Sequence, residues 1–180
     1  MRKLQSSELI RKTAEEAKAA EKNPLIVVLD NVRSAYNVGS VFRTADAFLI
    51  EAVYLCGITA FPPHRQIAKT ALGATESVRW KHFKNTEECL ADLRNSGYTL
   101  LAAEHTTQSI FLHKYFPSQD EKTALIFGNE VDGLTQEIVT LCDSSIEVPQ
   151  AGIKHSLNVS VCAGIVIWDL INKMKHLAGR

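Results

Sequence analysis

The residues best suited to chemistry lie near the end of the chain, in the run VPQAGIKHSLNVS at residues 148–160. A short β-like run enters a loop in which Gly152 is expected to allow tight curvature. The loop leads to Ser156 and Asn158, at the start of an apolar helical pattern. Hydroxyl and amide side chains at a helix N-terminus are usually caps. They can also orient a ligand, so this segment alone leaves both roles open.

Two earlier segments repeat the arrangement of a strand, a polar glycine-containing loop and a helix. Residues 31–43 hold Asn37 and Arg43, and residues 127–133 hold Glu130. The carboxyl ends of parallel strands meet at one edge of a sheet, where α/β proteins bind their ligands. We therefore expect the polar side chains of all three segments to share one site.

Arg43 has two possible roles. It lies among apolar residues of the predicted helix, and a charge in such surroundings needs a partner. One interpretation is a salt bridge to Glu130 or Asp46. The other is a phosphate clamp, since the planar guanidinium group matches a phosphate. Arg33, in the preceding loop, is a second candidate for a phosphate contact.

The run GNEVDGLT at residues 128–135 has the glycine spacing of a phosphate-binding loop. That motif needs Lys before its Ser or Thr, but Leu134 stands there. The carboxylates of Glu130 and Asp132 would also repel phosphates. The chain has no GxGxxG motif, so nucleoside triphosphates and dinucleotides are disfavoured. Exposed backbone beside carboxylates suits a ligand with polar edges and a positive centre. On these residues alone, an ordinary turn with acids at a helix N-terminus is the simpler explanation.

Taken together and in order, the three segments resemble the SpoU/TrmH-type ribose 2'-O-methyltransferases of the SPOUT superfamily. The matching runs are NVGSVFRTA at residues 37–45, LIFGNEVDGL at residues 125–134, and residues 149–160. The resemblance implies methyl transfer from S-adenosylmethionine to a ribose 2'-hydroxyl of tRNA or rRNA. It also implies a C-terminal trefoil knot and a homodimer.

The resemblance assigns cofactor contacts to the backbone near Gly128, Val148 and Leu157, and it implies no metal. It assigns catalysis to a second set of residues: Arg43, Asn37, Glu130, Ser156 and Asn158. Arg43 is implied to activate the hydroxyl, either as a base or only as a phosphate clamp, because a guanidinium group stays protonated. His105 and His155 are generic candidates for a base, without support from the family pattern.

Two other functions stay open. A non-catalytic RNA-binding protein on the same fold would be expected to have lost one of the five catalytic residues, and all five are present. A knotted methyltransferase that modifies a base carries other loop motifs, and the run from Ser156 to Asn158 points to ribose.

Composition predicts one domain over residues 1–180, with 46% hydrophobic residues and a net charge of zero. A neutral chain must concentrate its Lys and Arg to bind RNA phosphates. The candidate clusters lie at the two ends: Arg2, Lys3, Arg11, Lys12, Lys18 and Lys22, interleaved with acids, and Lys173, Lys175 and Arg180. The four cysteines form no CxxC pair, and no apolar run approaches the roughly 20 residues of a membrane span. We expect a cytoplasmic protein with reduced thiols, without metal or membrane contact.

Alternating β and α patterns predict a mostly parallel sheet with helices on both faces. The continuous apolar run at residues 25–29 predicts a strand buried on both sides. Further strands are expected at residues 52–56, 78–83, 99–103, 123–127 and 145–148. Helices are expected at about residues 5–22, 38–49, 66–72, 85–96, 135–141 and 157–175. Asn85 and Glu88 form a capping pair in this scheme, and residues 104–115 are expected to be loop and short helix.

Overall fold

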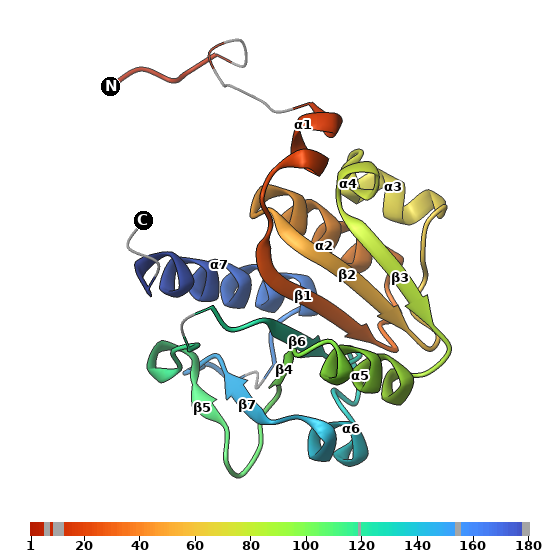
Figure 1. Cartoon of the computed structure of the whole chain (residues 1–180), viewed down its shortest axis with the longest axis vertical. Coiled ribbons are helices and arrows are strands. Elements are labelled where there is room, and N and C mark those ends of the chain that lie inside the picture. The colour runs from red at the N-terminus through yellow and green to blue at the C-terminus, as the bar shows by residue number, and fades with distance from the viewer. Residues whose placement is uncertain (6–7, 9–12, 119, 154–155, 178–180) are drawn as a thin grey trace.

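The computed structural model describes residues 1–5, 8, 13–118, 120–153 and 156–177. In this part of the chain one sheet has the strand order β3-β2-β1-β6-β4-β7-β5, and every neighbouring pair is parallel (Figure 1). The predicted parallel α/β sheet is confirmed. The strands are β1 (Asn23–Asp30), β2 (Ile50–Cys56), β3 (Arg79–Phe83), β4 (Thr99–Ala103), β5 (Ile110–Phe111), β6 (Thr123–Phe127) and β7 (Ser144–Glu147).

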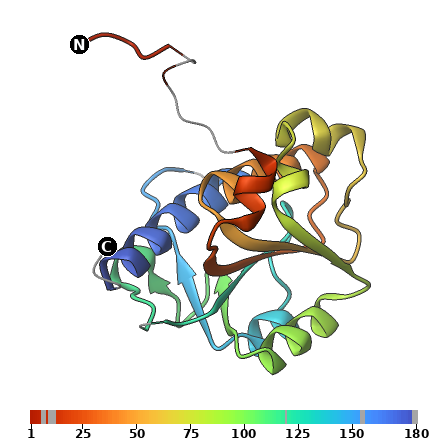
Figure 2. The same cartoon turned by 45° about the horizontal axis from the view of Figure 1, so that its top comes forward.

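Helices cover both faces of this sheet (Figure 2). One face carries α2 (Ala35–Ala47), α3 (Arg65–Ala71), α4 (Ala74–Ser77) and α7 (Val159–Leu177), and the other carries α5 (Thr86–Asn95) and α6 (Gln136–Leu141). None of the helices in the described ranges has the length and hydrophobicity needed to cross a membrane.

Strand β1 is buried on both faces of the sheet, which explains why apolar and polar residues do not alternate in its sequence. Leu25, Val27 and Leu29 point into the core under α2 and α7, whereas Ile26 and Val28 point into the core under α5 and α6. All five side chains are at most 2% exposed. Because β1 lies between β2 and β6, its carboxyl end delivers residues 31–34 to the middle of the sheet edge.

Helices α2 and α3 approach each other closely at Gly39. A Cβ on Gly39 would lie 2.1 Å from Thr70 Oγ1 and 2.4 Å from the carbonyl oxygen of Ile67. Glycine therefore permits the packing that holds α2 in place, although it weakens a helix interior.

The N-terminal helix is shorter than predicted. Within the described residues, α1 covers Ala14–Ala19, because Thr13 and Glu16 form a capping box and Ala20 is already extended. Asn23 and Pro24 begin β1 instead of ending a helix. Residues 6–7 and 9–12, including Arg11 and Lys12, lie outside the described residues.

The C-terminal helix agrees closely with its predicted range, but Lys173 differs from the expectation of a free cation. Its Nζ forms an ion pair with Asp169 at 2.5 Å and donates to the carbonyl oxygen of Leu112. Lys173 thus ties α7 to the short 3-10 helix η2 (Leu112–Lys114). Its ammonium group is therefore paired within the protein, and whether the C-terminal cluster binds RNA stays a prediction.

Candidate active site

Three side chains join the three predicted segments in one chain of hydrogen bonds. Asn37 Nδ2 donates to Glu130 Oε1 at 2.8 Å, and Asn158 Nδ2 donates to Asn37 Oδ1 at 3.1 Å. Asn37 lies in α2, Glu130 in the loop after β6, and Asn158 directly before α7. The expected convergence of these loops at the carboxyl edge is therefore present.

Glu130 holds the first turn of α2. Its carboxylate accepts the backbone N–H groups of Arg33 at 3.0 Å and Ser34 at 3.2 Å, besides the Asn37 amide. Partial burial raises the pKa of Glu130, but these hydrogen bonds outweigh that effect and leave the pKa below its ordinary value. The carboxylate also faces the positive end of the helix dipole. It is therefore ionised at neutral pH.

Asn158 has both of the roles that its sequence left open. Its Oδ1 accepts the N–H of Ser160 at 2.9 Å and that of Val161 at 3.4 Å, so it caps α7. Its Nδ2 is left to bind Asn37. One amide therefore starts α7 and links it to α2.

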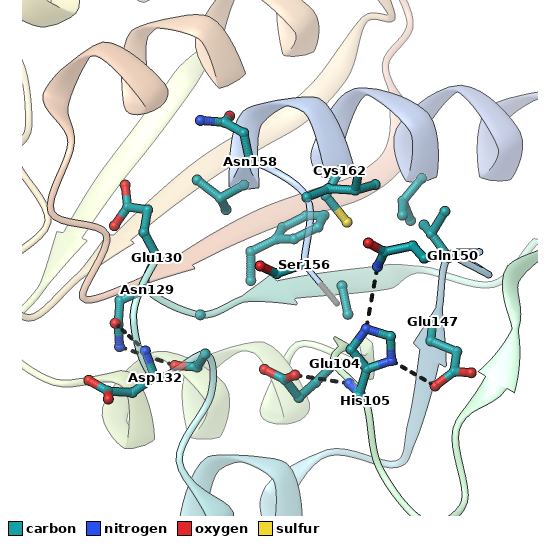
Figure 3. Close-up of a pocket in the computed structure, with 18 of the residues that line it drawn as sticks. Glu104, His105, Asn129, Glu130, Asp132, Glu147, Gln150, Ser156, Asn158 and Cys162 are labelled. Carbon is teal, nitrogen blue, oxygen red and sulfur yellow. Dashed lines mark hydrogen bonds and ion pairs between the residues drawn. The ribbon is translucent and has the colours of Figure 1, made fainter. Parts of the chain in front are cut away.

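A cavity of about 440 Å³ lies beside this chain of hydrogen bonds, within the usual size range of small-molecule sites (Figure 3). It is lined by Gly128, Val148, Ser156 and Leu157, together with the end of β4 and the first turns of α7. Its apolar walls include Phe127, Val148, Leu157, Val159 and Val166, and its carboxylates are Glu104, Glu130, Asp132 and Glu147.

Glu104 shapes the wall of the cavity, although it lies outside the three motif segments. Its Oε2 accepts the N–H of Leu134 and its Oε1 accepts the N–H of His105, each at 2.9 Å. It also lies against Gly133, where a Cβ would come within 2.3 Å of Oε2. A polar residue directly after a buried parallel strand was the signal that could have found it.

His105 faces the same cavity in a fixed orientation. Its Nδ1 lies 3.0 Å from Glu147 Oε2 and its Nε2 lies 3.5 Å from Gln150 Nε2 (Figure 3). A carboxylate accepts only, so Nδ1 carries a proton and Nε2 is the acceptor in the neutral ring. His155, the other generic candidate, lies outside the described residues.

Cys162 lines the cavity as an unreactive thiol. Burial, with a smaller effect from the charge of Glu104, raises its pKa to about 11. The thiolate is the nucleophilic form of cysteine, so Cys162 is a wall residue at neutral pH. In the described part of the chain, no group of His, Cys, Asp and Glu side chains has the arrangement of a metal site.

Arg43 differs from the expectation of a charge enclosed by apolar neighbours. It lies on the exposed side of α2 and makes no hydrogen bond or ion pair with any described residue. The proposed salt bridges are wrong, because Glu130 is bound by α2's first turn and Asp46 accepts the hydroxyl of Ser77. Arg33 is paired with Asp132 at 3.5 Å.

Comparison with known proteins places this site in a family. The model of the SpoU rRNA Methylase family matches residues 24–168, a range that contains all three segments. The chain belongs to this family. The predicted family membership is thus confirmed.

Curated SpoU-type relatives share most of this chain. The 23S rRNA (guanosine-2'-O-)-methyltransferase RlmB of Neisseria meningitidis serogroup B is 31% identical over 146 residues, which are 81% of this chain and 57% of the relative. The protein of the same name from Vibrio vulnificus is 31% identical over 86% of this chain and 62% of its own length. The chain therefore spans about three fifths of these relatives.

Solved structures confirm the SpoU fold. The TrmH/SpoU tRNA modifying enzyme of A. aeolicus has a TM-score of 0.78 and 26% identity, covering 92% of this chain and 82% of that one. An AdoMet-bound rRNA methyltransferase from Sinorhizobium meliloti has a TM-score of 0.76 and 28% identity, covering 83% of this chain and 56% of that one. The trefoil knot remains a prediction, since strand order does not define how the chain is threaded.

The single chain brings together most of the residues that the SpoU motifs predicted as catalytic. Asn37, Glu130 and Asn158 are in contact, and Ser156 lines the adjoining cavity. Arg43 forms no hydrogen bond or ion pair with these described residues. The predicted cofactor residues Gly128, Val148 and Leu157 all line the cavity.

Proposed function

We propose that this SpoU protein transfers a methyl group from S-adenosylmethionine to the 2'-hydroxyl of a ribose in tRNA or rRNA, in the cytoplasm. The observation that carries the proposal is the hydrogen-bonded chain Asn158–Asn37–Glu130 beside the 440 Å³ cavity. The names of the relatives support the reaction, and the AdoMet-bound structure from Sinorhizobium meliloti supports the cofactor.

The cavity suits S-adenosylmethionine in shape and charge. Apolar side chains of Val148 and Leu157 can flank the adenine ring, and the backbone near Gly128 can hydrogen-bond its polar edge. Carboxylates such as Glu104 and Asp132 match the ammonium and sulfonium charges. When bound, the cofactor supplies a methyl group activated by the positive sulfur.

The chain's own residues then have to position the ribose. In-line transfer depends on holding the hydroxyl at contact distance from the methyl carbon. We assign to Arg43 the binding of a phosphate next to that ribose. Its positive charge would favour release of the hydroxyl proton to water as the 2'-oxygen bonds to the methyl carbon and the carbon–sulfur bond breaks. Glu130 and Asn37 fix the first turn of α2. They therefore fix the position of the helix that carries Arg43.

We further propose that the protein is a homodimer in which α7 is covered by a second copy. Val161, Ile165 and Trp168 follow the spacing of one helix face and are 52%, 39% and 57% exposed. Three large apolar side chains in a row on one exposed helix face indicate a protein–protein contact. A second copy is the occupant that the resemblance predicts.

The decisive experiment is mass spectrometry of nucleosides from total tRNA and rRNA of cells with and without the gene. We expect one 2'-O-methylated nucleoside to disappear in the deletion, and the purified protein with S-adenosylmethionine to restore it. Loss of a base-methylated nucleoside would instead support the knotted base methyltransferase. RNA binding without any methyl transfer would support the non-catalytic alternative.

A further inference from the structure

One segment outside the SpoU motifs carries a local excess of positive charge. Residues 52–86 contain five Lys and Arg residues and a single carboxylate, Glu76. The five cations are Arg65, Lys69, Arg79, Lys81 and Lys84. Neither terminal cluster has such an excess. A neutral RNA-binding protein needs a local surface of this kind.

Two exposed aromatic rings lie within this basic segment. Phe61 stacks on Trp80 with ring centroids 6.2 Å apart and an interplanar angle of 28°, and the centroid of His82 lies 4.4 Å from that of Phe61. Phe61 is 46% exposed and Trp80 is 37% exposed. His82 Nε2 lies 3.1 Å from the carbonyl oxygen of Gly57, which fixes the third ring. The three rings form a preformed aromatic surface, which we call the ring cluster.

The ring cluster is linked to the candidate active site through two hydrogen-bonded loops. Trp80 and His82 lie on β3, at one edge of the sheet (Figure 1), and Phe61 lies in the loop that follows β2. That loop is tied to the loop after β1 by two hydrogen bonds. The N–H of Ile58 donates to Asn31 Oδ1 at 3.1 Å, and the N–H of Val32 donates to Thr59 Oγ1 at 2.9 Å. The loop bearing Phe61 therefore packs on the loop that leads into α2.

Three of the five cations of the basic segment remain unpaired. Arg79 is paired with Glu51 and Lys81 with Asp92, each at 3.0 Å. Arg65, Lys69 and Lys84 are exposed and form no ion pair with any residue in the described ranges. Single-stranded nucleic acids bind where aromatic faces for the bases lie beside cations for the phosphates.

We propose that the ring cluster stacks an unpaired base of the substrate RNA near the methylated nucleotide, while Arg65 and Lys84 contact the adjoining phosphates. This inference rests on the proposed function, because it takes RNA as the substrate. Sequence-specific RNA recognition usually targets unstacked bases in loops, and stacking tolerates any base because each has a π face. The target nucleotide thus lies in a single-stranded or loop region.

The test uses the two tryptophans of the chain, Trp80 and Trp168. Cofactor-free protein is titrated with 12-nucleotide oligo(A), oligo(U) and total tRNA, and tryptophan emission is recorded. In Trp168→Phe, the remaining Trp80 is expected to be quenched as RNA binds. In Trp80→Phe, the emission of Trp168 is expected to stay constant.

Affinity provides the second readout. Phe61→Ala is expected to weaken RNA binding about 5- to 100-fold, with unchanged affinity for S-adenosylmethionine and an unchanged melting temperature. Phe111→Ala is the matched control. Phe111 is 41% exposed and its ring centroid lies 5.8 Å from that of His113. It belongs to β5, at the other edge of the sheet. This variant is expected to bind RNA normally. In a double variant, Arg65 and Lys84 are both replaced by Ser. The slope of log binding constant against log salt concentration is expected to become shallower by about 1.4.

The outcomes separate this inference from the proposed function. Constant Trp80 emission at saturating RNA, equal affinities of the Phe61 and Phe111 variants, or no RNA binding by the wild type would each overturn the ring cluster as an RNA site. Quenching of Trp80 without methyl transfer to any RNA would refute the proposed function and leave the ring cluster supported.

Discussion

Asn158 Nδ2 donates a hydrogen bond of 3.1 Å to Asn37 Oδ1, and this bond joins the start of α7 to the first turn of α2 across 121 positions of sequence. Because Asn37 in turn binds Glu130, the three loops of the carboxyl edge are held in one arrangement. The relationship separates two functions of Asn158, since different atoms of its amide cap α7 and bind Asn37.

Asn158→Asp should remove only one of these functions. Aspartate keeps the oxygen that caps α7 but cannot donate to Asn37. We expect near-normal thermal stability and a strong loss of methyl transfer. Asn158→Ala should lose the cap as well, which costs about 1 kcal/mol of unfolding free energy. Chemical denaturation would measure the stability of each variant, and single-turnover methylation would measure its rate. Equal losses of stability in the two variants would contradict the idea that different atoms of Asn158 serve the two functions.

Arg43→Ala should abolish methyl transfer without affecting the fold. Arg43 is exposed and unpaired with any described residue, so its removal leaves no buried charge behind. Loss of phosphate positioning and hydroxyl activation should lower the rate about 100-fold or more. Arg43→Lys should recover little, because an ammonium group lacks the planar fork.

The matched control for Arg43 is Arg94→Ala, an exposed arginine on the opposite face that pairs with Asp143. The Arg94→Ala variant should methylate RNA at the normal rate. Calorimetry should show the same cofactor affinity in both variants. Near-normal turnover by Arg43→Ala on a validated RNA would refute the assignment.

Glu130→Gln should make the protein less stable in a pH-dependent way. The pKa of Glu130 is lowered in the folded protein, so its stabilising effect is present above the ordinary carboxyl pKa and is lost as pH falls below it. At any pH from 6 to 8, we expect the unfolding free energy of the variant to be about 1 kcal/mol below that of the wild type. The effect is small because the group is exposed and water screens its charge. The difference from wild type should shrink below about pH 4. Thermal unfolding from pH 8 to below pH 4 would measure this difference. A difference between variant and wild type that does not change with pH would argue against the hydrogen-bonded carboxylate.

Gly128→Ala should prevent cofactor binding. A Cβ at this position would lie 2.1 Å from the carbonyl carbon of Gly133 and 2.3 Å from the nitrogen of Leu134. These are backbone atoms, so the loop that lines the cavity must move. Gly152→Ala is the control, because nothing lies within 4 Å of a Cβ there. Calorimetry with S-adenosylmethionine should show lost binding in the first variant and normal binding in the second.

Ile165→Glu should convert the proposed dimer to a monomer of 19.9 kDa. The side chain is at the centre of the exposed stripe on α7, and burying an unpaired charge in a contact is costly. Leu72→Glu, which changes a residue that is 66% exposed near α3, should leave the dimer intact. Sedimentation equilibrium at micromolar concentration would decide, and a wild-type monomer would contradict the dimer itself.

Most of the sheet could be predicted from the sequence because buried parallel strands are continuous apolar runs. The run at residues 25–29 became β1, and the run at residues 123–127 became β6. The two-residue strand β5 could not be predicted, since Ile110 and Phe111 are exposed and too few to show a pattern. α4 was also missed, because four residues are about one helical turn.

The site was only partly predictable for a different reason. Loop order and residue type were enough to bring Asn37, Glu130 and Asn158 together. Successive residues of a helix point about 100° apart, so residues adjacent in sequence lie on different sides of it. α2 begins at Ala35 instead of near Val38, and the apolar neighbours of Arg43 in sequence did not make it buried. Gly152 lies in a bend of the loop but has neither a left-handed φ nor a close neighbour that would require glycine, so its role in tight curvature stays a prediction.

The contact between Glu104 and Gly133 constrains how this protein can evolve. Gly133 has a φ of +67°, which Asn and Asp tolerate better than other residues with side chains. Even these two would displace the Glu104 carboxylate, because their Cβ would lie 2.3 Å from Oε2. Because that carboxylate accepts the N–H groups of Leu134 and His105, a side chain at position 133 would also cost these hydrogen bonds, so substitutions at positions 104 and 133 are coupled.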